Sequence, residues 1–369
     1  MKVAYCIRKD WDSPNNKGGD TTQLLKTMNN VLKYGESVDI EIITDAELLD
    51  GSYDIAHIFN FATLDISTEF FNKAKSLNLK VAFSTIYWDY SYSYNFFSKV
   101  WNNTFFNQVD AFLFKKIASL INKPIVLSPK FKKQVSIFME GADILLPNSI
   151  EEYYKICEFI DANPRKFIHK VNVIYNAADV VENKYIEKKE FLEKYNLPQE
   201  PYILQIGRIQ FIKGQLNLVK AMLDNNLPIV FVGAIAEEKY FNKIKRIADK
   251  RKNVYFVDYV NNKEVCNFYK YAALHVLPSL RESPGLVSLE ALLNQCKIVA
   301  SNETFCPFDT YFKGIATSIN PLNIQSIKDG ILKELNTERN FVEIQELIHT
   351  DFSWKRAGID TFNAYKKVI

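Results

Sequence analysis

The sequence predicts an α/β protein built from two doubly wound Rossmann-like domains that face each other across a cleft. Three observations lead to this prediction. The chain has 369 residues, which is too many for one ordinary core and about right for two domains. Short β-rich runs alternate with helical stretches along the chain, as is typical of parallel α/β layers. A polar stretch, Ala177 to Pro201, separates two such series and indicates a linker with a short helix.

The first series predicts an N-terminal domain over residues 1–178. Its expected strands are 3–7, 39–43, 54–59, 80–84, 124–127, 143–146 and 172–175. Its expected helices are 21–33, 67–76 and 151–160. The amphipathic stretch 352–369 follows at the far end of the chain, with Trp354, Ile359, Phe362 and Tyr365 on one side.

The second series predicts a C-terminal domain over residues 179–351. Its expected strands are 202–206, 229–232, 254–257, 275–277, 298–300 and 316–319. Its expected helices are 215–223, 237–250, 263–271, 286–293 and 324–335. Ligands of doubly wound sheets sit beyond the carboxyl ends of the strands, so we expect the chemistry in the cleft between the two sheets.

Charge and composition exclude several classes of protein. A formal net charge of +3 is too small to indicate a nucleic-acid partner. No apolar run approaches the roughly 20 residues that cross a bilayer, and the first residues lack a signal-peptide pattern, so we expect a cytoplasmic protein. The five cysteines stand singly without a CxxC pair, which argues against a disulfide framework or a zinc site.

Basic and aromatic residues are interleaved between residues 96 and 134, where Asp110 is the single acid. The lysines of this segment are Lys99, Lys115, Lys116, Lys123, Lys130, Lys132 and Lys133. One interpretation is a solvated helix surface over a packed aromatic core. The other is a peripheral contact with an anionic membrane that carries a lipid-linked acceptor.

Three clusters contain groups suited to a diphosphate, and the first is Lys17-Gly18-Gly19-Asp20-Thr21-Thr22. It follows the first strand and opens a helix. Adjacent glycines let backbone amides approach a ligand, and the helix N-terminus adds partial positive charge. The signal is weak alone, and a capping turn with Asp20 or Thr21 as the N-cap is the alternative.

The second cluster is Gly207-Arg208 followed by Lys213-Gly214, at the end of the first strand of the second domain. Arginine grips phosphate oxygens with a planar fork, and lysine adds a compact charge. Ordinary surface cations are the alternative.

The third cluster runs from Glu282 through Gly285 to Glu290, where a loop after a strand leads into a helix. Backbone amides at the start of that helix would be free donors, and Glu290, about one turn inside, could meet a ribose diol. Two solvated surface acids are the alternative.

Together these motifs resemble the family-4 retaining glycosyltransferases of the GT-B fold that act on bacterial surface polysaccharides. Glu282 and Glu290 match the family's two glutamates, which are separated by seven residues. Arg208 and Lys213 match its GR…KG phosphate clamp. Residues 173–179 resemble its IPNGVD hinge segment, and 352–354 resemble the start of its last helix, which crosses back to the first domain.

The resemblance implies roles for individual residues. Arg208, Lys213 and Glu282 would carry catalysis, the two cations by holding the donor diphosphate and the glutamate by contacting the transferred sugar. The donor-binding residues that it implies are Gly18, Gly19, Arg208, Lys213, Tyr259, Val260, Glu282, Gly285, Leu286, Val287 and Glu290.

The sequence departs from the family pattern in two places. Ser283-Pro284 stands where the family often has Gly-Phe, and Tyr87-Trp88-Asp89 stands where a histidine is common. These three residues are candidates for the acceptor side, either stacked on sugars or packed in a loop. His57 reads as a core or strand-end histidine.

The resemblance implies transfer of a sugar from a nucleotide-diphosphate donor to a glycan or lipid-linked glycan, with retention, in O-antigen or capsule synthesis. It implies no metal and no cofactor besides the nucleotide sugar; Asp10-Trp11-Asp12 has DxD spacing but lies too early in the chain. The protein would lie in the cytoplasm, at the inner face of the membrane if 96–134 docks there. Two alternatives stay open. One is a nucleotide-sugar-binding protein without transfer activity. The other is an NAD-dependent Rossmann oxidoreductase, although the GxGxxG motif expected of that class is missing from the sequence.

Overall fold

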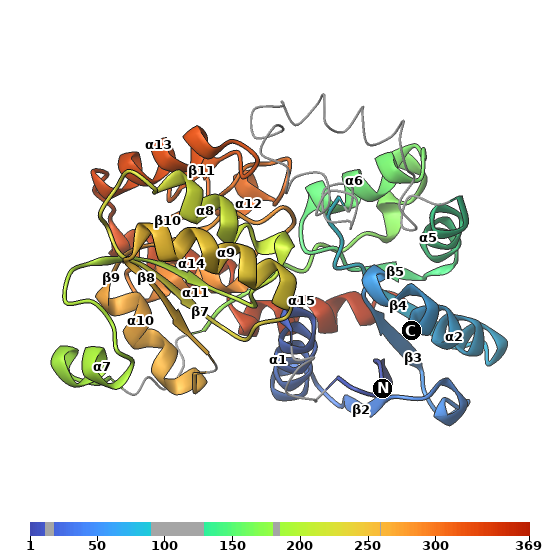
Figure 1. Cartoon of the computed structure of the whole chain (residues 1–369). Helices are drawn as coiled ribbons and strands as arrows, with labels where there is room; N and C mark the ends of the chain where they lie inside the picture. Colours follow the sequence, from blue (N-terminus) through green and yellow to red (C-terminus); the bar gives the residue numbers. More distant parts are fainter. Residues whose placement is uncertain (12–17, 90–128, 180–184, 259) are drawn as a thin grey trace. The chain divides into compact units, whose positions relative to one another are not determined.

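The computed structural model describes residues 1–11, 18–89, 129–179, 185–258 and 260–369 (Figure 1). The chain divides into two compact units. Among the described residues, unit 1 comprises Met1–Trp88, 129–178 and His349–Ile369, and unit 2 is formed within Asp179–Ile348. None of the helices that these residues form has the length and apolar character to span a bilayer.

Unit 1 is built on a five-stranded parallel sheet with the order β2-β1-β3-β4-β5. The strands are β1 (Lys2–Cys6), β2 (Asp39–Ile43), β3 (Ile55–Phe59), β4 (Lys80–Ser84) and β5 (Ile144–Leu145). Apart from the strand ends and the edge strand β2, their residues are buried, as expected for a sheet with both faces covered. The winding reverses between β1 and β3, which makes their carboxyl ends the switch point of this unit.

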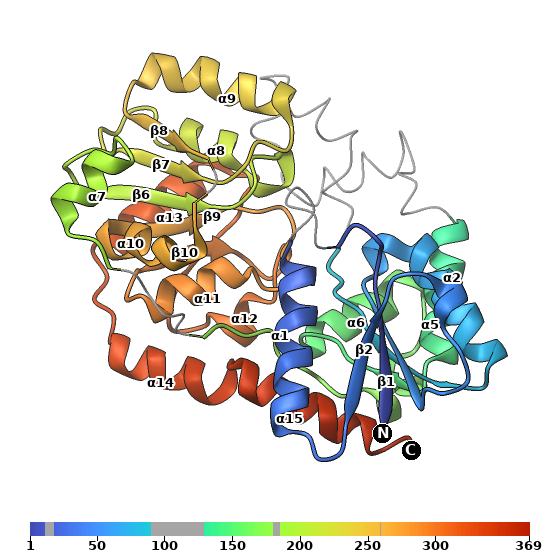
Figure 2. The same ribbon diagram turned by 90° about the horizontal axis from the view of Figure 1, so that it is seen from below.

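Helices cover both faces of this sheet (Figure 2). They are α1 (Gly19–Tyr34), α2 (Leu64–Ser76), α5 (Pro129–Gly141), α6 (Ile150–Phe159) and α15 (Trp354–Tyr365). The last helix packs on α1, and the two backbones approach so closely that a Cβ on Gly358 would lie 2.5 Å from Cβ of Asn30. Only glycine fits at this crossing.

A buried polar network ties α15 to the sheet. Nδ1 of His57 lies 2.5 Å from the Tyr365 hydroxyl, and Nε2 lies 2.8 Å from the hydroxyl of Ser84. The Tyr365 hydroxyl also donates to that of Tyr5 at 3.0 Å. His57 is a core histidine, as its sequence context predicts.

Unit 2 is built on a six-stranded parallel sheet with the order β11-β10-β9-β6-β7-β8. The strands are β6 (Tyr202–Ile206), β7 (Ile229–Val232), β8 (Val254–Val257), β9 (Ala272–Leu277), β10 (Ile298–Ser301) and β11 (Thr317–Ile319). The chain adds β7 and β8 on one side of β6, then returns to place β9 on the other side. The switch point therefore lies between β6 and β9.

The helices of unit 2 also lie on both faces, with α8, α9 and α13 on one side and α10 and α11 on the other (Figure 2). They are α7 (Lys188–Lys194), α8 (Gln215–Ala221), α9 (Glu238–Arg251), α10 (Val265–Tyr271), α11 (Leu286–Leu293), α12 (Phe308–Tyr311) and α13 (Ile324–Leu335); α14 (Phe341–Asp351) spans the boundary with unit 1. The main core lies under α8, α9 and α13, where Leu218, Ile244 and Ile331 are fully buried.

The observed elements differ from the predicted ones in several places. The predicted strand 172–175 is wrong as an assigned strand, because the only bridge in this part of the described chain is that of Val171 to Leu145. Backbone contact continues beyond it, since the N–H groups of Asn172 and Ile174 donate to the carbonyls of Leu145 and Pro147, both at 2.9 Å. The predicted strand 124–127 lies outside the described residues. Helix α5 begins inside the basic-aromatic segment 96–134 and was not among the predicted helix ranges, although a helix surface was one interpretation of that segment.

Candidate functional site

The loops that follow β6 and β9 leave the sheet on the two sides of the switch point of unit 2. This is the edge where ligands of doubly wound sheets bind. The loop after β6 carries Arg208 and Lys213, and the loop after β9 carries Glu282. The structure thus brings two of the three predicted clusters to one edge of one sheet.

Two glycines shape the loop after β6. Gly207 has a φ of +147°, and its N–H donates to the carbonyl of Val232 at 2.9 Å. Gly214 is left-handed with a φ of +69°, and a Cβ there would lie 2.1 Å from the carbonyl oxygen of Pro278. Because Pro278 follows β9, this glycine lets the two loops touch. The N–H of Leu280 completes the contact by donating to the carbonyl of Ile212 at 2.8 Å.

Lys213 and Glu282 form an ion pair across the switch point. Their Nζ and Oε1 atoms are 2.5 Å apart, and the side chains are 20% and 11% exposed, so both are held firmly yet remain reachable. Arg208 is exposed, and among the described residues its side chain has no partner. A cation in such a place can hold a phosphate oxygen, and a carboxylate can accept from a sugar hydroxyl.

The N-terminus of α11 adds backbone donors beside Glu282. Gly285 is the N-cap with a φ of +98°, and no side chain caps the helix. The first N–H groups of a helix have no partner within it, so those of Leu286 and Val287 are available to a ligand. A Cβ on Gly285 would lie 3.5 Å from Cδ of Glu282, which places the helix end against that carboxylate.

Glu290 lies on the second turn of α11 and is half-buried. The hydroxyl of Tyr269 donates to Oε2 of Glu290 at 3.3 Å and to the carbonyl of Val287 at 3.1 Å. Burial, and then the charge of Glu290, raise the pKa of Tyr269, which therefore stays a donor. The carboxylate is held in one orientation, as a ribose ligand would need to be.

Sequence reasoning missed His275, which is fully buried in β9. The N–H of Ile206 donates to its Nε2 at 3.3 Å. The available signal was weak: a single polar residue in the apolar run Ala272–Leu277.

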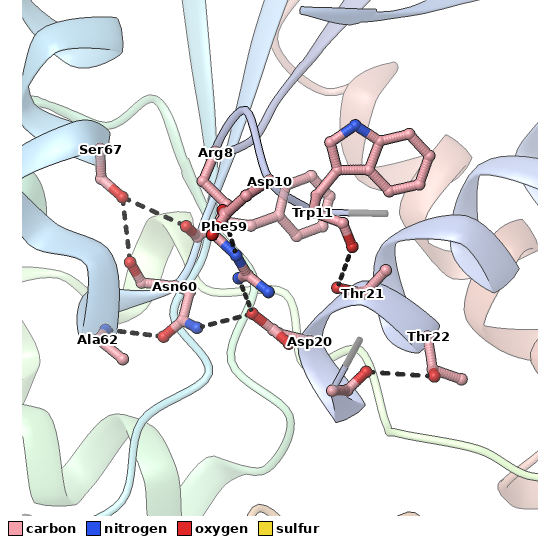
Figure 3. Close-up of polar contacts among 11 residues, drawn as sticks. Arg8, Asp10, Trp11, Asp20, Thr21, Thr22, Phe59, Asn60, Ala62 and Ser67 are labelled. Atoms are coloured by element: carbon pink, nitrogen blue, oxygen red, sulfur yellow. Dashed lines mark hydrogen bonds and ion pairs between the residues drawn. The ribbon is translucent and has the colours of Figure 1, made fainter. Parts of the chain in front are cut away.

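In unit 1, Gly18 and Gly19 lie at the N-terminus of α1, after β1. The alternative that Asp20 or Thr21 caps this helix is wrong, since the N-cap is Gly18 and no side chain caps it. The carboxylate of Asp20 instead pairs with Arg8 at 2.6 Å and accepts from Asn60 at 3.4 Å (Figure 3). These three side chains join the carboxyl ends of β1 and β3 to α1.

The segment after β4 is packed inside the protein. Tyr87 and Trp88 are 2% and 1% exposed, so neither ring presents a face at the surface. This burial agrees with the interpretation of a packed loop. The buried carboxylate of Glu152 accepts from the N–H of Tyr87 at 2.9 Å, and Lys155 lies 4.7 Å from the centre of the Trp88 ring. Asp89 is half-buried, and its acceptor contact stays a prediction.

Several predicted residues lie outside the described part of the chain: Tyr259, Lys17, Asp12 and residues 96–128 of the basic-aromatic segment. Val260, predicted beside the base, is buried. Within the described residues no three His, Cys, Asp or Glu side chains gather as a metal site would require.

Two units, each with a parallel sheet and helices on both faces, define the GT-B class of α/β proteins. Solved structures of this class cover essentially the whole chain. Sucrose-phosphate synthase from Thermosynechococcus elongatus covers 100% of this chain and 99% of its own, with a TM-score of 0.71 at 14% identity. Anabaena HepE in complex with UDP-glucose covers 100% of both chains, with a TM-score of 0.71 at 12% identity. At these identities the likeness concerns the fold.

The relationship by sequence is to glycosyltransferases. Residues 187–346 match the family described as Glycosyl transferases group 1. The O-antigen chain mannosyltransferase B of Escherichia coli is 25% identical over 203 residues, 52% of each chain. An uncharacterized 41.2 kDa protein in the cps region of Klebsiella pneumoniae is 28% identical over 192 residues, 50% of this chain and 51% of its own. The chain thus spans about half the length of the curated relatives it matches.

Proposed function

We propose that the chain is a glycosyltransferase that moves a sugar from a nucleotide-diphosphate donor to a glycan or lipid-linked glycan, with retention at the anomeric carbon. The observation that carries the proposal is the partly buried Lys213–Glu282 pair, flanked by the exposed Arg208 and the uncapped end of α11. These groups gather at the switch point of unit 2, within the segment that matches the glycosyltransferase family.

Each group has a place in the proposed donor site. Arg208, Lys213 and the amides of Gly285, Leu286 and Val287 surround the diphosphate with positive charge. Glu282 accepts from hydroxyls of the transferred sugar, and Glu290 from those of the ribose. Gly18, Gly19, Tyr259 and Val260 stay predictions of further donor contacts.

In the proposed reaction the bond between the anomeric carbon and the diphosphate oxygen breaks, and a bond to an acceptor hydroxyl oxygen forms on the same face. The hydroxyl proton passes to an oxygen of the leaving phosphate. Negative charge grows on the diphosphate as the bond breaks, and fixed cations and amides at that point stabilise the transition state more than the ground state. The residues therefore act by position and charge, and no metal is assigned a step.

The relatives suggest where such a reaction takes place. One is a mannosyltransferase of O-antigen chains, and another is encoded in a cps region. By analogy we place this chain in bacterial surface-polysaccharide synthesis, in the cytoplasm or at the inner face of the membrane.

Thermal shift with UDP, GDP, ADP and TDP and their sugars tests the proposal. A ligand at about 100 times its Kd adds roughly 2.7 kcal/mol to the stability of the folded protein. We expect one nucleoside diphosphate and its sugar to raise the melting temperature. Slow consumption of that donor should continue when EDTA is added.

A shift with NADH and none with any nucleoside diphosphate would contradict the proposal and favour the oxidoreductase. Donor binding without transfer or hydrolysis across a broad acceptor panel would favour a binding protein.

A further inference from the structure

Strands β6 and β9 separate before they end. Leu204 and His275 are the last partners in their register. Beyond them, β6 still pairs with β7 as far as Ile206, and β9 still pairs with β10 as far as Leu277. At the switch point β6 thus remains paired with β7 and β9 with β10, but β6 and β9 no longer pair with each other.

The side chain of His275 takes the place of the missing ladder bond. It is fully buried, and its Nε2 accepts from the N–H of Ile206 at 3.3 Å. Ile206 directly precedes Gly207 and Arg208. The hydrogen bond therefore fixes β6 at the residue from which the proposed phosphate-binding turn departs.

The same ring reaches the α11 side of the site. His275 and Tyr269 pack edge to face with their ring centres 5.8 Å apart. Tyr269 in turn holds Glu290 and the first turn of α11 through its hydroxyl. One imidazole is thus coupled to both groups of residues that we assign to the donor.

Stability alone gives histidine little advantage here. Because Nε2 accepts, the ring proton is on Nδ1, and no described residue accepts from it. Burial, and then the charge of Lys213, lower the pKa of His275 to about 3, so the ring is neutral. A buried unpaired N–H costs about 1–3 kcal/mol. A leucine would leave the N–H of Ile206 unpaired instead, so the choice exchanges one unpaired group for another.

We propose that His275 is a positioning residue of the donor site, which holds β6 and β9 apart at the switch point and fixes the Gly207–Arg208 turn for a diphosphate. This inference rests on the function proposed above. It goes further in giving the site a buried residue that touches no substrate.

Calorimetric titration well below the unfolding temperature tests the inference with UDP, GDP and ADP as probes. His275→Leu removes the acceptor and should weaken binding of the preferred diphosphate by about tenfold, the effect of one ordinary hydrogen bond. His275→Gln restores an acceptor for Ile206 and should recover most of the affinity. Wild-type affinity in His275→Leu would overturn the inference.

His57→Leu is the matched control, because His57 is equally buried but lies in unit 1. We expect it to lower the melting temperature and leave diphosphate affinity unchanged. An equal loss of affinity in both leucine variants would assign His275 a merely structural role. Failure of the wild type to bind any of the three probes would overturn the proposed function and the inference together.

A second measurement on the wild type does not depend on a variant that folds. Long-range ¹H–¹⁵N spectra report the tautomer of a neutral histidine. We expect His275 to be protonated at Nδ1 near neutral pH, and its Nε2 resonance to move when the preferred diphosphate binds. Protonation at Nε2 would be incompatible with the hydrogen bond from Ile206 and would overturn the inference.

Discussion

Arg208 and Lys213 carry the two positive charges of the loop after β6, but their surroundings differ. Lys213 is neutralised by Glu282 at 2.5 Å, whereas the side chain of Arg208 is exposed and has no partner among the described residues. A diphosphate must therefore compete with Glu282 for Lys213, whereas it can bind Arg208 without displacing another group. The two cations should respond differently to substitution.

Arg208→Ala should slow sugar transfer by about 10²–10³, the usual cost of one donor that stabilises transition-state charge. The melting temperature should stay near that of the wild type, because an exposed side chain without partners contributes little to stability. Steady-state kinetics and thermal melts measure both quantities. Arg246→Ala, which removes an exposed arginine of α9 in the same unit, is the control. Wild-type turnover in Arg208→Ala would refute the assignment.

Glu282→Gln should separate binding from transfer. The glutamine carries no negative charge, so it no longer competes with a diphosphate for Lys213. The affinity for the free nucleoside diphosphate should therefore rise several-fold. The rate of transfer should fall, because the sugar loses its carboxylate contact. Titration with the diphosphate and assay with the nucleotide sugar give the two readings. Weaker diphosphate binding would indicate that the glutamate only supports the loop.

The residues of this site differ in how far sequence reveals them. Arg208, Lys213, Glu282 and Glu290 could be nominated because their spacing fits a strand-loop-helix pattern. Their contacts could not: Lys213 and Glu282 are 69 residues apart, and only the pairing of β6 with β9 brings them together. His275 carries only a weak local signal, a polar residue in an apolar run, because its importance comes from the point where two strands separate.

At the scale of elements, buried strands were the most predictable part of the fold. Residues 39–43, 80–84, 202–206, 229–232 and 254–257 form strands with the predicted bounds, and 286–293 and 324–335 form the predicted helices. Residues 172–175 run beside β5 and the residues after it, to which Asn172 and Ile174 donate, but β5 has only two residues, so no regular strand forms there. The length of the facing strand is not visible in the run itself. Helix α5 was given no bounds in advance, because the interleaved lysines and aromatics of 96–134 indicated a helix surface without showing where a helix begins or ends.

Gly214 joins two elements of the site, so its substitution should disturb both. In Gly214→Ala the new Cβ would lie 2.1 Å from the carbonyl oxygen of Pro278, which forces the loops after β6 and β9 apart. We expect a loss of more than 1 kcal/mol in the free energy of unfolding, from strain and overpacking together, and a marked loss of diphosphate binding. Denaturant unfolding and titration measure the two effects.

Gly314→Ala is the matched control for Gly214→Ala. Gly314 also has a positive φ, of +83°, but a Cβ there has no neighbour within 4 Å. It should show the backbone strain alone and keep wild-type affinity for the diphosphate. Equal effects at the two glycines would mean that contact with Pro278 is unimportant.

At the scale of the whole molecule, each unit encloses one neutral histidine. Burial lowers the pKa of His57 in unit 1 to about 3, and burial with the charge of Lys213 lowers that of His275 in unit 2 to the same value. The ring of His57 meets Tyr5, Phe59, Ser84 and Tyr365, none of them charged at neutral pH. Among the described residues, no acid raises the pKa of either ring, since burial and, for His275, the charge of Lys213 are what shift it.

Acid should therefore destabilise both units. In the unfolded chain each histidine titrates near its ordinary pKa of about 6.5, while the folded ring stays neutral down to about pH 3. Below pH 6.5 the unfolded state binds more protons, so the free energy of unfolding falls as the pH decreases, by about 2 kcal/mol per histidine at pH 5. Scanning calorimetry at about pH 7.5 and pH 5 measures the loss. His57→Leu should reduce the pH dependence of the transition of unit 1 and His275→Leu that of unit 2, because each removes one proton-binding group from the unfolded state of its own unit. An unchanged pH dependence in both variants would mean that these two rings are not what makes the protein sensitive to acid.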